Sequence, residues 1–218
     1  MNNKKHLICA ICLFAAFVIF TALVCCVDVK AVGADNTNVG FSRLNMYVHR
    51  LTGAHLALYH LTDWLSLVPL GAVPFFAAVG LIQWIRRKSL LKVDRSLLAL
   101  GALYVLAGAV YLLFESFAIN YRPILIDGAL ESSYPSSTTM LVLCVVPFSA
   151  SYIAARVKNK TFKRIVSVMA NSFTALMIIA RLVSGVHWFT DIVGAVLAGL
   201  SLVMLCRYIG EVEDEKAE

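Results

Sequence analysis

Six long apolar runs dominate this chain of 218 residues and restrict it to a small set of folds. Each run approaches the roughly 20 residues with which an α-helix crosses a hydrocarbon core of about 30 Å. The fifth is the shortest, and we expect its helix to extend through residue 183. The sequence therefore predicts six membrane-spanning helices, at approximately residues 7–27, 65–85, 96–114, 138–155, 165–180 and 192–209.

The composition agrees with lipid as the main solvent. Hydrophobic residues make up 60% of the chain and charged residues only 15%, whereas soluble domains carry about 25% charged residues. We predict an all-α integral membrane bundle that forms a single domain over residues 1–218. The first run follows Lys4 and Lys5, as a signal peptide would, but it exceeds the 7–15 apolar residues of a signal core and favours a retained helix.

The basic residues predict the orientation of the bundle. Fourteen of the 19 lysines and arginines lie in the N-terminus, the second and fourth connections and the tail. By the positive-inside rule both termini are expected in the cytoplasm, in what we take to be a bacterial plasma membrane. The net charge of +6 thus marks topology and indicates no nucleic-acid partner.

Three segments are then expected at the outer face, at residues 28–64, 115–137 and 184–190. In the first, apolar residues recur at helical spacing between Gly40 and Gly53 and again after Gly53. This pattern predicts short amphipathic helices lying on the bilayer surface.

The six cysteines offer an alternative function. The spacing of Cys9 and Cys12 resembles a redox or metal pair, which would suit a redox or assembly protein. All six nevertheless lie within or beside apolar runs, where a thiol packs as a small apolar group. We therefore expect a structural role for all six cysteines.

Polar residues are absent from the centres of the runs and gather at one membrane face. No Asp, Glu, Lys, Arg or His lies at the centre of a run, which disfavours a proton-coupled transporter or an ion pump. The outward connections instead contain Arg122, Ser136, Arg181, His187 and Asp191. Because three separate stretches deliver these residues to one face, we expect a site there.

His187 and Asp191 are four residues apart, so on a helix they share one face. A carboxylate there would hold one imidazole nitrogen and leave the other free as a base or nucleophile. The alternative is an interfacial histidine beside a helix-capping aspartate.

Arg122 and Arg181 suit a phosphate ligand because guanidinium groups match phosphate oxygens in pairs. Alternatively, each would extend to lipid headgroups. Ser136, Ser137 and Thr138 begin the fourth predicted helix, where free N–H groups create an anion site or, more simply, a capped helix end. Together these groups would hold a phosphate in position for attack by an imidazole.

These residues resemble the signatures of the type 2 phosphatidic acid phosphatase family. Residues 181–191, RLVSGVHWFTD, match the spacing of its third signature, Arg-x5-His-x3-Asp. Residues 121–123, YRP, are similar to the end of the first, Lys-x6-Arg-Pro, and residues 134–138, YPSST, to the second, Pro-Ser-Gly-His. The resemblance covers a phosphatase-like core at about residues 115–209.

The resemblance implies a role for each matched residue. His187 would attack phosphorus and become a phosphohistidine, and Asp191 would orient it. No metal is required in this family, so the resemblance implies neither a metal nor a cofactor. The phosphoryl oxygens would be held by Arg122, Arg181, Ser136 and the N–H groups of Ser137 and Thr138.

Three positions depart from the signatures: Glu115 stands for the lysine, Ala180 for a serine and Thr138 for the histidine that protonates the leaving oxygen. Loss of a general acid typically costs 10²–10⁴-fold in rate. A lipid diphosphate would need less help, because its leaving phosphate has a pKa of about 6. Alternatively, another residue could supply the proton, and the candidates for this substitute acid are Asp127, Glu131, His49, His55 and His60.

The sequence therefore predicts a metal-independent membrane hydrolase that acts on a lipid phosphate or isoprenyl diphosphate at the outer face. The alternative is a catalytically weakened relative that binds or transports lipid phosphates without cleaving them.

Overall fold

The computed structural model describes residues 3–215 of the chain, and it is almost entirely helical. A short hairpin of β1 (Lys30–Ala31) and β2 (Asn38–Val39) encloses the 3₁₀ turn η1 (Ala34–Asn36), and a second 3₁₀ turn, η2, spans Leu90–Lys92. The α-helices are α1 (Asn3–Cys26), α2 (Ser42–Thr52), α3 (Leu56–Leu65), α4 (Leu67–Arg87), α5 (Arg95–Ser116), α6 (Ser137–Arg156), α7 (Lys160–Val183) and α8 (Phe189–Glu215).

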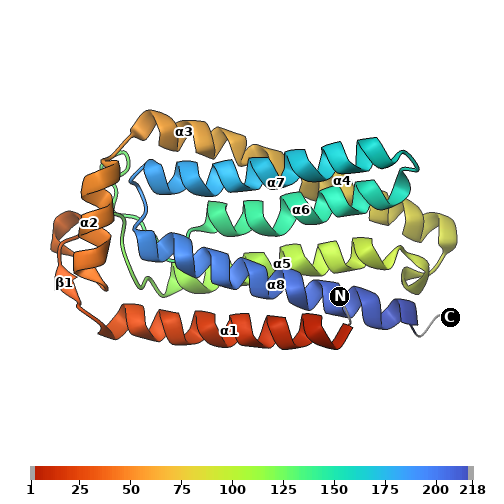
Figure 1. The fold of residues 1–218 in the computed structure, drawn as a ribbon, viewed down its shortest axis with the longest axis horizontal. Helices are drawn as coiled ribbons and strands as arrows, with labels where there is room; N and C mark the ends of the chain where they lie inside the picture. The colour runs from red at the N-terminus through yellow and green to blue at the C-terminus, as the bar shows by residue number, and fades with distance from the viewer. Residues whose placement is uncertain (1–2, 216–218) are drawn as a thin grey trace.

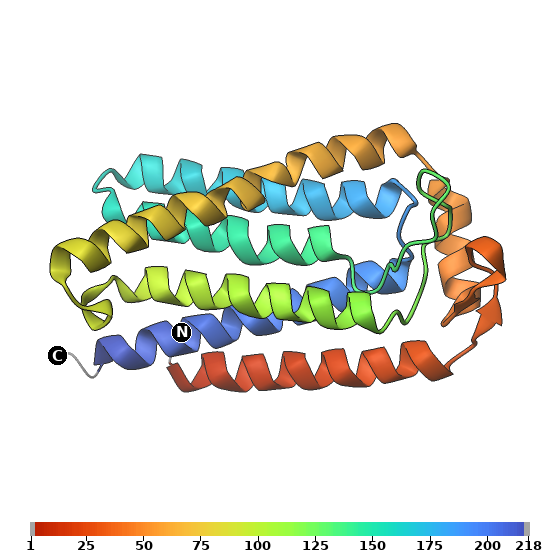
Figure 2. The same ribbon diagram turned by 180° about the vertical axis from the view of Figure 1, so that it is seen from behind.

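The six predicted spanning helices are confirmed. Six described segments are long and apolar enough to cross a membrane: Lys4–Cys26, Leu56–Arg87, Arg95–Ser116, Ser137–Arg156, Lys160–Val183 and Phe189–Ile209. The long helices run side by side along one axis (Figures 1 and 2). Their outward faces carry exposed large apolar side chains, as expected where lipid replaces water.

The core of the bundle lies among α5, α6 and α8, and α1 packs along α8. Leu100 and Leu103 of α5 meet Cys144 and Val145 of α6 and Ala195 of α8, and all five are buried. Small residues on α8 let its neighbours approach closely, which is how helices associate inside a membrane.

The two ends of the bundle differ in content. The start of α1 and the end of α8 lie at one end, together with the α4–α5 and α6–α7 connections (Figure 1). The β hairpin, α2, the loop between α5 and α6 and the turn between α7 and α8 lie at the other end (Figure 2). The segments predicted to face outward therefore lie together at this end, except for α3.

Helices α2 and α3 differ in direction. Helix α2 lies across the end of the bundle, as a surface helix would, whereas α3 runs along α7 and continues into α4 after Ser66 (Figure 1). The segment after Gly53 thus does not lie flat on the end. Tyr59 and Thr62 are buried, and α3 packs on α7 through this face.

Asp94 joins three helices at the opposite, basic end. Its carboxylate accepts hydrogen bonds from Gln83 of α4, from Arg87 at 3.0 Å and from Arg156 of α6. Burial would raise the pKa of Asp94, but these three donors outweigh burial and hold the pKa at about 2. The carboxylate therefore stays charged and ties α4, α5 and α6 together.

Candidate active site

Three buried polar residues surround the turn between α7 and α8. Arg181 lies in the last turn of α7, His187 in the connection and Asp191 in the first turn of α8. Their exposed fractions are 2%, 4% and 0%. Polar groups of this kind are rarely buried without hydrogen-bond or ionic partners.

The two ring nitrogens of His187 have different neighbours, and these define the tautomer. Nδ1 lies 3.2 Å from the carbonyl oxygen of Ser133, which can only accept a hydrogen bond. Nε2 lies 3.4 Å from Nη2 of Arg181, which can only donate. Nδ1 therefore carries the hydrogen, and the lone pair of Nε2 faces the guanidinium.

The charge environment keeps this imidazole neutral. Burial lowers the pKa of His187 well below its usual 6.5, and the positive charges of Arg122 and Arg181 lower it further. A neutral imidazole with a directed lone pair has the form that a nucleophile or base requires.

Asp191 supports the turn that carries His187. Its Oδ2 accepts a hydrogen bond of 2.9 Å from the backbone N–H of Trp188, and its Oδ1 accepts one of 3.3 Å from Asn120. Oδ2 lies 3.7 Å from Nδ1 of the neutral His187 imidazole, which is too long for a hydrogen bond. In this structure the carbonyl of Ser133 holds the imidazole directly, and Asp191 holds the backbone of the turn.

The side chain of Tyr59 brings the two predicted arginines together. The guanidinium carbon of Arg181 lies 4.9 Å from the centre of the Tyr59 ring, and that of Arg122 lies 5.3 Å from it. Arg181 also donates a 3.1 Å hydrogen bond to Thr62 and lies 3.9 Å from the carboxylate of Asp63. Cation–π contact with one ring fixes two like charges near each other.

A tight hairpin in the α5–α6 loop positions Arg122. The N–H of Arg122 donates to the carbonyl of Glu131 at 3.0 Å, and the N–H of Ser133 donates to the carbonyl of Asn120 at 2.9 Å. At the tip, Asp127 and Gly128 have φ values of 49° and 76°. Positive φ at both central residues is typical of the two-residue turns that close hairpins, and the Asp-Gly pair could have revealed this element in the sequence.

The side chain of Arg122 pairs with Glu131 across this hairpin. Its Nε lies 3.0 Å from Oε2 of Glu131, although the two are not aligned for a hydrogen bond. Nε and Nη1 of Arg122 are buried and have no hydrogen-bond partner, and the same is true of Nε of Arg181. Buried N–H groups of this kind are ready to bind an anion.

The start of α6 also contributes to the site, but the side chain of Ser136 does not cap the helix. Ser136 precedes the helix, yet its hydroxyl donates to Thr139 at 3.0 Å instead of capping the backbone. The N–H of Ser136 donates to the carbonyl of Asp191 at 3.2 Å. Ser137 and Thr138 occupy the first turn, where backbone N–H groups have no intrahelical acceptor.

A polar cavity of about 270 Å³ brings some of the predicted site residues together. His187, Arg122 and Ser137 line it, whereas Arg181, Asp191, Ser136 and Thr138 are not among its lining residues. Of the candidate substitute acids, Glu131 lines the cavity, and so does Glu115. The other lining residues are Tyr111, Phe114, Ser132, Ser133, Tyr134 and Pro135.

Several supporting residues were not predicted. Asn45 of α2 donates to the hydroxyl of Thr190 at 2.9 Å and accepts from its N–H at 3.1 Å, which ties the surface helix to α8. Asn120, Ser133 and Tyr59 also contact the predicted residues directly. Only their polarity within outward segments marked them in the sequence.

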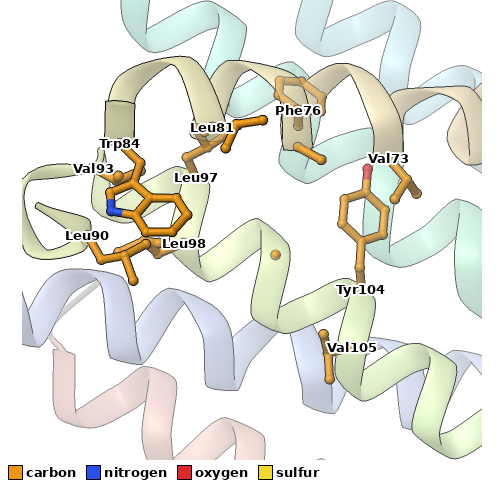
Figure 3. A pocket seen from close by; sticks show the side chains of 13 residues that line it. Val73, Phe76, Leu81, Trp84, Leu90, Val93, Leu97, Leu98, Tyr104 and Val105 are labelled. Carbon is orange, nitrogen blue, oxygen red and sulfur yellow. The ribbon is translucent and has the colours of Figure 1, made fainter. Parts of the chain in front are cut away.

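A larger, apolar cavity lies elsewhere. It has a volume of about 570 Å³ and is lined by apolar side chains of α4, η2 and α5, among them Phe76, Trp84 and Leu97 (Figure 3). It contains none of the predicted site residues. Among the described residues, no group of three or more His, Cys, Asp and Glu side chains could hold a metal ion.

Comparisons with known proteins identify the family of the chain and a structure with a similar fold. The family model described as the PAP2 superfamily matches residues 74–213. A solved structure, the first transmembrane PAP2 type phosphatidylglycerolphosphate phosphatase from Bacillus subtilis, is similar over 96% of this chain and 97% of that chain, with a TM-score of 0.63 and 21% sequence identity. The search of curated proteins finds no match.

Proposed function

This chain belongs to the PAP2 superfamily, and from that premise we propose that it is a membrane lipid phosphatase with a phosphohistidine intermediate. Membership of this family and six apolar helices support a lipid phosphatase of the membrane in general. The observation that supports the proposed mechanism is the neutral His187 imidazole, whose Nε2 lies 3.4 Å from a guanidinium nitrogen of Arg181.

The proposed reaction has two steps. The phosphoryl group would bind among Arg122, Arg181 and the N–H groups at the start of α6, where it replaces Arg181 as the neighbour of Nε2. Nε2 would then attack phosphorus in line with the leaving oxygen, and water would hydrolyse the phosphohistidine. Binding in a fixed geometry and charge neutralisation are the two contributions that phosphoryl transfer needs most.

Ser136, Ser137 and Thr138 have unequal places in this proposal. Ser137 lines the cavity and could contact the phosphoryl oxygens directly. Ser136 instead stabilises the start of α6 through its hydrogen bonds to Thr139 and to the carbonyl of Asp191. Thr138 would contribute its backbone N–H. Neither a metal nor a cofactor takes part in this mechanism.

We place the site at the outer face of the membrane. The positive-inside rule assigns the basic end of the bundle to the cytoplasm. The α5–α6 loop and the α7–α8 turn, which contribute residues to the polar cavity, lie at the opposite end (Figure 1). At that depth the site would meet the phosphate of a lipid in the outer leaflet. A lipid monophosphate or an isoprenyl diphosphate would present its phosphate there.

The alternative function is binding or transport of lipid phosphates without cleavage. Glu115 and Thr138, which replace a lysine and a histidine of the family signatures, favour this alternative. Glu115 accepts a hydrogen bond of 2.7 Å from Ser132 and lines the cavity, so it brings negative charge where the signature has positive charge.

Phosphate release from lipid substrates by the purified chain separates the two functions. We expect the wild-type protein to release phosphate and to form an acid-labile phosphoenzyme, and His187→Gln to lose both by about 10³-fold or more. His60→Gln changes an exposed histidine of α3 and serves as the matched control. Full activity in His187→Gln would refute the mechanism, and lipid binding without phosphate release in the wild type would establish the alternative.

A further inference from the structure

The polar cavity contains an unusual pair of acidic side chains. Glu115 and Glu131 line it together with His187 and Arg122. A site that binds a phosphate gains nothing from carboxylates that only repel it. Each of them is therefore a candidate for a function in the chemistry.

The missing function is donation of a proton to the leaving oxygen. Thr138 occupies the place of the signature histidine, and its hydroxyl is far too weak an acid for efficient transfer near neutral pH. Tyr134 also lines the cavity, but its hydroxyl is 2.7 Å from that of Thr21, and burial raises the pKa of Tyr134 above its usual 10. The two carboxyl groups are better donors.

The structure favours Glu131 over Glu115. Oε2 of Glu131 lies 3.0 Å from Nε of Arg122, the residue that would hold the phosphoryl group. A backbone hydrogen bond between the same two residues places them opposite each other in the hairpin. Glu115 lies at the end of α5 and is engaged with Ser132.

We propose that Glu131, which contacts Arg122 in the cavity lined by His187, donates the proton to the leaving oxygen in place of the missing histidine. This inference rests on the proposed phosphatase function. In the free protein Glu131 neutralises Arg122. A bound phosphate takes over that contact with Arg122, and Glu131 takes up a proton from solvent as the phosphate binds.

The proton and electron pairs balance over two steps. In the first, Nε2 of His187 forms a bond to phosphorus, the bond to the leaving oxygen breaks, and the Glu131 carboxyl proton passes to that oxygen. In the second, the Glu131 carboxylate takes a proton from water as the water oxygen attacks the phosphohistidine. Inorganic phosphate leaves, Nε2 of His187 regains its lone pair, and Glu131 releases to solvent the proton that it took up when the substrate bound, as its carboxylate contacts Arg122 again.

A comparison of leaving groups tests the role of Glu131. Alkyl phosphate monoesters such as phosphatidic acid expel a basic alkoxide and need the proton, whereas p-nitrophenyl phosphate expels a stabilised phenolate and needs it much less. We expect Glu131→Gln to lower kcat for phosphatidic acid by 10²–10⁴-fold and kcat for p-nitrophenyl phosphate by less than about tenfold. Glu131→Asp should restore part of the phosphatidic acid activity.

Two variants with the same chemical change serve as controls. Asp127→Asn alters a carboxylate at the exposed tip of the same hairpin and should behave as the wild type. Glu115→Gln alters the other carboxylate of the cavity and should affect both substrates to the same extent.

The outcomes distinguish this inference from the proposed function. Equal losses for both substrates in Glu131→Gln would show a structural or binding role and overturn the inference. A leaving-group dependence in Glu115→Gln instead would assign the proton to Glu115 and also overturn it. In both cases loss of activity in His187→Gln would leave the proposed function intact, whereas full activity there would refute that function independently.

Discussion

The backbone carbonyl of Ser133 lies 3.2 Å from Nδ1 of His187, so the hairpin that precedes α6 holds the imidazole that follows α7. This contact fixes the tautomer and leaves Nε2 with its lone pair. It also joins two stretches of chain 54 residues apart. The position of the candidate nucleophile therefore depends on the fold of the α5–α6 loop.

Replacement of Asp191 by asparagine tests the support of the turn. Asparagine lacks the carboxylate that accepts the 2.9 Å hydrogen bond from the N–H of Trp188, and this position is fully buried. We expect a loss of about 1–3 kcal/mol in the free energy of unfolding and a lower kcat. Thermal unfolding in detergent and phosphate release measure the two effects, and wild-type values for both would contradict this account.

Replacement of Arg181 by lysine tests the planar guanidinium. An ammonium group cannot keep the contacts with Thr62, the Tyr59 ring and Nε2 of His187 at once. We expect kcat/KM to fall by about 10–100-fold, since hydrogen bonds to charged groups are worth about 1.5–3 kcal/mol. Thr62→Val removes one neighbour of Arg181 and should have a smaller effect; a larger effect would mean that Thr62 and not the guanidinium shape is decisive.

Replacement of Gly185 by alanine tests the close approach of two outer segments. Gly185 has a φ of +65°, and a Cβ there would lie 1.6 Å from the carbonyl oxygen of Gly53. The backbone must shift, which displaces the turn containing His187, so we expect at least a tenfold loss of activity and a lower melting temperature. Gly128→Ala, at a φ of +76° in open space, isolates the cost of backbone strain and should retain most of the activity.

The depressed pKa of His187 predicts a pH dependence of stability. The folded state keeps this imidazole neutral while the unfolded chain takes up a proton as the pH falls through about 6.5, so the unfolded state gains stability below that pH. His187→Gln should remove a stability loss of up to about 1.4 kcal/mol per pH unit over this acidic range. Melting temperatures at pH 5 and pH 7 for wild type and variant measure this, and parallel changes in both proteins would refute it.

The sequence alone predicted the six spanning helices because each is a local property: a stretch of apolar residues long enough to cross the bilayer. The third family signature is equally local, because Arg181, His187 and Asp191 lie within 11 consecutive residues. The amphipathic pattern after Gly53 predicts a surface helix, but the corresponding helix α3 runs along the bundle. In the structure, packing against α7 decides its direction, since Tyr59 and Thr62 meet Arg181 there.

Only the tertiary structure decided which groups meet. The contact of Ser133 with His187, the place of Tyr59 beside two arginines and the pairing of Glu131 with Arg122 join segments from different helices and loops. Apolar periodicity and motif spacing report the neighbours of a residue along the chain and its exposure to lipid. They contain no information on the distance between two loops, because that distance results from the packing of all the helices that the loops connect.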